Sequence, residues 1–136
     1  MYPEELVMPM KHELTDKGFQ DLTTPEQVDS ALQDKGTTLL MINSVCGCAA
    51  GAARPGTLYS LTGDKKPDHL VTVFAGFDKD AVAEARKFLA PFPPSSPCIA
   101  LFKDGELVHM LERHHIEGNP AGAIAANLQA AYDEFC

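Results

Sequence analysis

The chain has 136 residues, 45% of them hydrophobic, so it is long enough to bury a core and is not a disordered chain. Its net charge is −8, with 11 scattered basic residues, and such a surface offers nucleic-acid phosphates no basic patch. It has neither the roughly 20 consecutive apolar residues that cross a bilayer nor the leading basic and apolar runs of a signal peptide. We therefore expect one cytoplasmic domain over residues 1–136, with no nucleic acid or membrane as partner.

Apolar periodicity and turn residues predict helices that alternate with strands. In chain order we expect a short helix in a poorly bounded N-terminal extension of about 24 residues, a helix at 25–35, a strand at 37–43, a helix at 49–61, a strand at 69–75, a helix at 78–90, a hairpin at 98–111 and a helix from 119 to the C-terminus. Thr24, Pro25 and Gln27 have the pattern of a capping box, and Asp78 is the expected N-cap of the fourth helix. Asp104-Gly105 is a type I′ turn signal.

Strands joined by crossover helices pair in parallel, whereas a hairpin pairs antiparallel. The fold class that this order of elements predicts is α/β, with a central mixed sheet flanked by helices. Within it, Pro55 is expected to kink or shorten the helix at 49–61.

The four cysteines are the main chemical signal in the chain, namely Cys46, Cys48, Cys98 and Cys136. In an intracellular chain of this size, cysteines more often serve redox chemistry or metal binding than a disulfide framework. Cys46 and Cys48 lie between a predicted strand and a predicted helix, where free backbone N–H groups and the helix dipole favour a thiolate. A thiolate attacks disulfides, and a second thiol this close can attack the resulting mixed disulfide.

The spacing of one residue, Gly47, sharpens this interpretation. A disulfide between the two flanking cysteines closes a small, strained ring, and strain makes it easier to reduce; Gly47 supplies backbone freedom for the tight turn. The alternative is a metal or iron–sulfur site that uses Cys46, Cys48 and Cys98, although the chain has no second closely spaced cysteine pair. We interpret Cys98 as a small residue at a strand start rather than an extra resolving thiol, and Cys136 as an exposed chain end.

Pro97 ends a proline-rich connector just before a predicted strand, and most X–Pro bonds in folded proteins are trans. The segment 97–106 is nevertheless similar to the thioredoxin segment in which a cis-proline precedes a strand ending in Phe-Lys-Asn/Asp-Gly. Over nearly its full length the chain resembles the bacilliredoxins, most clearly at residues 1–3, 43–51, 53–55 and 115–118.

The resemblance implies a thioredoxin-like fold with a Cys-x-Cys centre, in which Cys46 is the nucleophile, Cys48 is the resolving cysteine and Pro97 is the cis-proline. It implies a thiol–disulfide oxidoreductase that removes a low-molecular-weight thiol, bacillithiol, from S-thiolated client proteins. Disulfide isomerase activity, which older descriptions of the family give, follows from the same chemistry. We expect no metal or organic cofactor, with bacillithiol as the co-substrate.

A few other side chains are weighed beside this centre. Arg54 either contacts an anionic thiol or is a solvated helix charge. His114 or His115 can tune a thiolate if one of them approaches Cys46, whereas His109 is expected at the surface. The strand at 37–43 contains no acid, so the buried carboxylate of thioredoxins has no counterpart there.

Overall fold

The computed structural model describes residues 1–136 and contains a five-stranded sheet with strand order β1-β3-β2-β4-β5. The strands are β1 (Gln20–Asp21), β2 (Thr37–Asn43), β3 (His69–Phe74), β4 (Cys98–Lys103) and β5 (Glu106–Leu111). The helices are α1 (Glu4–Thr15), α2 (Pro25–Leu32), the π-helical turn η1 (Ala49–Ala53), α3 (Arg54–Ser60), α4 (Lys79–Phe88), α5 (Arg113–Ile116) and α6 (Ala121–Phe135). None of these helices is long and apolar enough to cross a membrane.

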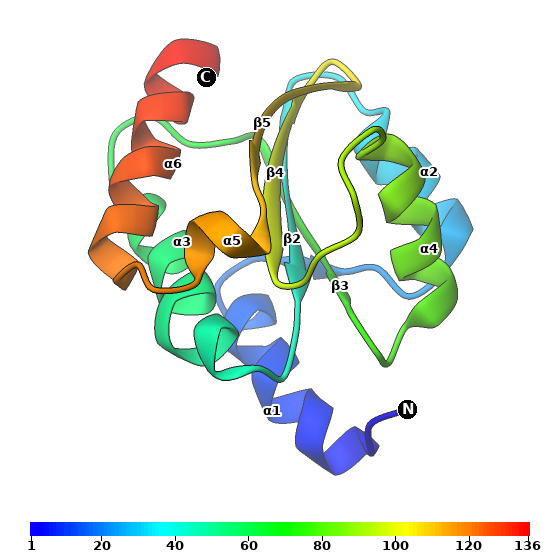
Figure 1. Cartoon of the computed structure of the whole chain (residues 1–136). Helices are drawn as coiled ribbons and strands as arrows, with labels where there is room; N and C mark the ends of the chain where they lie inside the picture. Colours follow the sequence, from blue (N-terminus) through cyan, green and yellow to red (C-terminus); the bar gives the residue numbers. More distant parts are fainter.

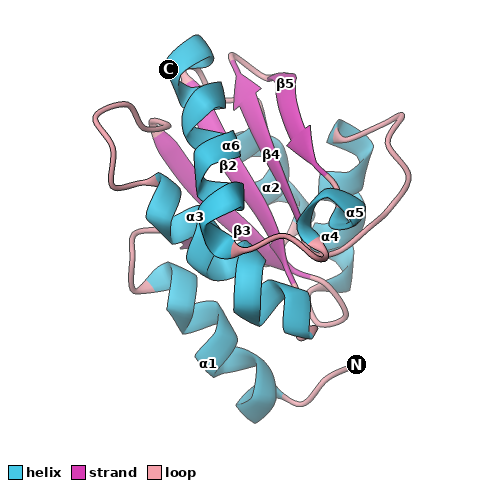
Figure 2. Ribbon diagram, turned by 60° about the vertical axis from the view of Figure 1, so that its left-hand side comes forward, coloured by secondary structure: helices cyan, strands magenta, loops and turns pink.

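The sheet is mixed and covered on both faces, as the sequence predicts. β3 pairs in parallel with β1 and β2, whereas β4 pairs antiparallel with β2 and β5. Helices α2 and α4 cover one face, and α3 and α6 cover the other (Figures 1 and 2). Alternation along β2 sends Leu39 and Met41 into the core under α3 and α6, and Leu40 and Ile42 into the core under α2 and α4. β2 is therefore buried along its whole length.

Local signals locate several elements correctly. The bounds of β2, β4 and β5 match the prediction, and Asp104 and Gly105 both have positive φ, at 51° and 84°, as a type I′ turn requires. Thr24 caps α2 by accepting the backbone N–H of Gln27 at 3.2 Å. The reciprocal bond of the predicted capping box is displaced by one residue, because the Gln27 side chain accepts the N–H of Thr23 instead.

Other predictions differ from the structure. The 24 residues expected as an extension form α1 and β1, and β1 joins the edge of the sheet. Asp78 lies at the N-cap position of α4 but makes no capping bond, because its carboxylate pairs with the Lys11 ammonium at 2.7 Å. Pro55 does not break its helix: the chain passes through η1, in which the Arg54 N–H reaches five residues back to the carbonyl of Ala49, and α3 continues from there.

Candidate active site

The two closely spaced cysteines lie where β2 passes into the helix that leads to η1. β2 ends at Asn43, and helical structure begins at Gly47, so Cys46 lies just before the first turn and Cys48 within it. Both side chains are half-buried free thiols, and their Sγ atoms are 2.7 Å apart. Gly47 does not have the positive φ expected of a tight turn, and a Cβ there would meet no atom within 4 Å, so the predicted need for glycine is wrong.

The pKa values of the two thiols shift in opposite directions. Burial raises the pKa of Cys46, but hydrogen bonds from the Cys48 thiol, the Ser44 side chain and the backbone N–H groups of Ala49 and Cys48 outweigh it and lower this pKa below its usual value. Burial raises the pKa of Cys48, and its hydrogen bond to Cys46 raises it further, although the charge of Arg113 opposes this. Cys46 is therefore the thiol that ionises first.

The loop before β4 lies on the other side of Cys46. The Ser96–Pro97 peptide bond is cis, as the family resemblance implies, and a second cis bond at Ala90–Pro91 had no sequence signal. Ser96 and Cys46 line the same small pocket, so the segment containing Pro97 flanks the thiols.

Arg54 fixes the loop that carries Cys46 and is not a solvated helix charge, as it is only 2% exposed. Its Nη1 donates to the Asn43 Oδ1 at 2.9 Å and to the Ser44 carbonyl at 2.8 Å, and its Nε donates to Glu13 at 3.0 Å. Asn43 Oδ1 also accepts the Ser44 N–H, and Ser44 Oγ accepts the Cys46 N–H at 3.1 Å. Both sequence interpretations of Arg54 were wrong, because a lone arginine beside a helix proline does not show whether it points inward.

The pocket beside Cys46 has a volume of about 180 Å³ and is lined by Tyr2, Ser44, Val45, Cys46, Ala75, Gly76, Ser96 and Arg113. Arg113 is the only charged residue among them, and its Nη1 donates to the Ser96 carbonyl at 3.2 Å. Sequence reasoning missed Arg113 and Tyr2, because both lie far from Cys46 along the chain and belong to no local motif.

Cys98 does not join the cysteine pair. It is 1% exposed and packs in the core under α2 and α4, whereas Cys46 and Cys48 contact the core under α3 and α6. Burial raises the pKa of Cys98 to about 12, so its thiol stays protonated at neutral pH. The three thiols thus form no common ligand set, and Cys98 is the small strand residue that the sequence favoured. Cys136 is exposed at the end of α6, as expected.

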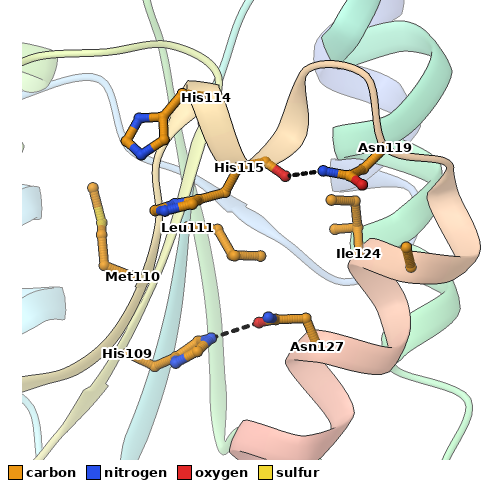
Figure 3. Close-up of a pocket in the computed structure, with 9 residues that line it drawn as sticks. His109, Met110, Leu111, His114, His115, Asn119, Ile124 and Asn127 are labelled. Atoms are coloured by element: carbon orange, nitrogen blue, oxygen red, sulfur yellow. Dashed lines mark hydrogen bonds between the residues drawn. The ribbon is translucent and has the colours of Figure 1, made fainter.

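The histidines line a second, larger pocket of about 500 Å³ between β5, α5 and α6, which contains none of the cysteines (Figure 3). His109 bonds Asn127 there at 2.7 Å, and no histidine is among the groups that shift the pKa of Cys46 or Cys48. Glu112, His114 and His115 place ligand atoms within 4.8 Å of one another, the only set that could hold a metal ion. However, Nδ1 of His115 already accepts the Glu112 N–H in the cap of α5, which leaves this set with a donor already in use.

Known proteins with similar sequences decide the family. A family model described as disulphide isomerase matches residues 2–136. A bacilliredoxin of Cytophaga hutchinsonii is 60% identical over 99% of this chain and 100% of its own length. A bacilliredoxin of Halalkalibacterium halodurans is 55% identical over 99% of this chain and 94% of its own. The chain belongs to the bacilliredoxin family.

The bacilliredoxin relatives and the fold agree on the class of activity. The solved structure of oxidised thioredoxin from Plasmodium falciparum covers 87% of this chain and 98% of its own with a TM-score of 0.58, at 18% identity. A likeness at this identity shows the fold, which is thioredoxin-like as predicted. Together with the family, it makes this bacilliredoxin a thiol–disulfide oxidoreductase.

Proposed function

We propose that the protein removes a low-molecular-weight thiol, bacillithiol, from mixed disulfides on client proteins, with Cys46 as the nucleophile and Cys48 as the resolving cysteine. The observation that carries the proposal is the 2.7 Å approach of two thiols whose pKa values shift in opposite directions. The lower pKa of Cys46 supplies a thiolate at neutral pH, and the raised pKa of Cys48 keeps the second thiol protonated until it is needed.

The reaction balances in two exchange steps. The Cys46 thiolate attacks the small-thiol sulfur of the mixed disulfide, a new S–S bond forms, and the client leaves as a thiolate that takes up a proton. Cys48 then loses its proton and attacks Cys46 Sγ, which releases the small thiol and leaves a Cys46–Cys48 disulfide. Two electrons from an external thiol reductant restore the dithiol. Alternatively, a second molecule of the small thiol attacks the adduct and leaves with the first as a symmetrical disulfide.

Two further parts of the proposal rest on context. Four free thiols suit a reducing compartment, so we place the reaction in the cytoplasm. Disulfide isomerase activity is the second candidate, because the matching family model carries that description and attack of Cys46 on a client disulfide is the same chemistry. Neither reaction needs a metal or an organic cofactor.

The decisive experiment uses a client protein that carries bacillithiol on one thiol. Cys48→Ala is expected to release the client and accumulate the small thiol on Cys46, whereas Cys46→Ala releases nothing; Cys136→Ala, at the exposed chain end, serves as the control. Release is followed by mass spectrometry of client and enzyme. Full activity of Cys46→Ala would contradict the assignment. The mass of the adduct trapped on Cys48→Ala from cells identifies the small thiol, and an adduct of another mass would replace bacillithiol.

A further inference from the structure

The pocket beside Cys46 has the size of the reacting end of a small molecule. Its volume of about 180 Å³ is well below the roughly 300–1,000 Å³ of pockets that enclose a drug-sized ligand. The Tyr2 ring lies against Gly76, where a Cβ would overlap it, and the Tyr2 N–H donates to the Gly76 carbonyl. The N-terminal residues thus wall the pocket on the side of β3, and Ser96 and Arg113 wall it on the side of β4.

Arg113 brings the pocket's only charge and has donors to spare. A guanidinium has five N–H groups. Three contacts use them here: Nε and Nη2 donate to Glu117 Oε1 at 3.2 and 3.1 Å, and Nη1 donates to the Ser96 carbonyl. Two N–H groups remain, one on each Nη atom. The side chain is 42% exposed and its partner Glu117 is 54% exposed, so a ligand can reach the guanidinium.

Charge makes this arginine more significant in an acidic protein. The net charge is −8, so an anionic small molecule is repelled by the surface as a whole and gains by meeting a fixed cation. Arg113 also lies close enough to both reacting thiols for its charge to couple with theirs. A carboxylate bound there is therefore held within reach of the sulfur that Cys46 attacks. Carboxylates are the usual ligands of a guanidinium fork.

We infer that this pocket is the subsite for the small-thiol half of the mixed disulfide, and that Arg113 in it binds a carboxylate of that thiol. The inference rests on the proposed function and deepens it, because it states which chemical class of small thiol the site accepts. The partner is a thiol bearing a carboxylate near its sulfur, and neutral or esterified thiols are poorer substrates.

The test compares two mixed disulfides on the same single-thiol client, one formed with L-cysteine and one with L-cysteine methyl ester. The two differ by one carboxylate charge. In the Cys48→Ala background, which isolates the first exchange step, the rate constant is expected to favour the cysteine adduct by about tenfold, the effect of one charge-assisted hydrogen bond. Arg113→Gln is expected to bring the ratio close to one, and Arg113→Lys, which keeps the charge but not the fork, to an intermediate value.

Lys103→Gln is the matched control, because it removes one exposed positive charge at the far end of β4 and should leave the ratio unchanged. Arg113 also contacts the carbonyl of Ser96, so a purely structural role would slow both substrates equally. An unchanged ratio in Arg113→Gln, or a ratio near one in the parent, would overturn the inference and leave the proposed function intact. Failure of the parent to react with either adduct would instead reject the proposed function.

Discussion

Two arginines near the thiols have different surroundings, and their surroundings decide their roles. Arg54 is buried, and its donors engage Asn43, Ser44 and Glu13 of the chain itself. Arg113 is half-exposed at the mouth of the pocket and keeps donors free. Arg54 is thus a positioning residue, because it acts on Cys46 only through Ser44, which bonds the Cys46 backbone N–H.

Replacing Arg54 with methionine should therefore change the ionisation of Cys46. Without the guanidinium, Ser44 and Asn43 lose a shared donor, and the hydrogen bonds that lower the pKa of Cys46 loosen. Alkylation of Cys46 requires the thiolate, so its rate rises as the pH passes this pKa. In the wild type the midpoint lies below the usual cysteine value, and in Arg54→Met it moves up in pH. Peptide mass mapping of alkylated Cys46 across a pH series measures both.

Ser44→Ala provides a second variant in case Arg54→Met does not fold, since it removes only the hydroxyl that bonds Cys46. It should move the midpoint in the same direction. Cys98 is the internal control in every sample, because its pKa of about 12 keeps it unreactive through neutral pH. A lower stability with an unmoved Cys46 midpoint in both variants would reduce Arg54 to a structural residue.

Among the elements, α3 and α6 make the closest helix contact on the face that carries the thiols. A Cβ built on Gly56 of α3 would lie 2.7 Å from Ile124 Cβ and 2.9 Å from the Ala121 carbonyl of α6. Gly56 is therefore needed for the spacing of the two helices rather than for a special backbone conformation, as its φ is not positive. This contact sets the depth at which the cysteine-bearing helix packs on the sheet.

Gly56→Ala should lower the free energy of unfolding by about 1–3 kcal/mol, because one added methyl group overpacks this interface. Gly122→Ala, in α6 itself, is the control: a Cβ there meets nothing within 4 Å, and alanine favours the helix by up to about 1 kcal/mol. Urea unfolding of both variants measures the difference. Equal stability of Gly56→Ala and the wild type would show that α3 and α6 can separate without loss.

The elements that the sequence predicts are those with local signals. β2 is an unbroken apolar run after Gly36, and the β4–β5 hairpin has its turn dipeptide, so both could be located to the residue. β1 and α5 were missed because two and four residues are too short to show a period. The widened turn η1 was missed because the change from four-residue to five-residue hydrogen bonding leaves no trace in the apolar pattern.

The same division applies to the site. Cys46 and Cys48 are neighbours in sequence, so their spacing and their place before a helix could be interpreted directly. Arg113, Arg54 and Tyr2 reach the thiols only through the tertiary fold, and no spacing along the chain indicates this. The sequence therefore predicts the reacting atoms, while the side chains that position and select around them require the structure.

Across the whole molecule, a buried ion cluster joins the N-terminal segment to the rest of the fold. Lys11 of α1, whose side chain is 4% exposed, pairs with Asp21 of β1 at 2.9 Å and with Asp78 before α4 at 2.7 Å. Burial alone would lower the pKa of Lys11, but its bonds to Asp78 and Asp21 raise it, so it stays charged. Burial raises the pKa of Asp78 despite Lys11, so Asp78 is the member that burial disfavours most as an anion.

Lys11→Met should destabilise the protein by roughly 3–5 kcal/mol, since it leaves two carboxylates without a cation in a buried site. Adding Asp78→Asn removes one of these charges and should recover part of the loss, so the two substitutions are not additive. The loss should also shrink as the pH falls, because Asp78 protonates above its usual pKa and an uncharged carboxyl needs no cation.

Urea unfolding at neutral and acidic pH measures the coupling, with Lys17→Met as the control: Lys17 is exposed, and its replacement should change the stability by less than about 0.5 kcal/mol. Additive effects of Lys11→Met and Asp78→Asn would mean that the cluster holds no shared energy. The observed geometry argues otherwise, because one ammonium joins three segments that are otherwise separate in the chain. α1 and the pocket wall formed by Tyr2 would then depend on the same ammonium, which connects the stability of the N-terminal segment to the shape of the site.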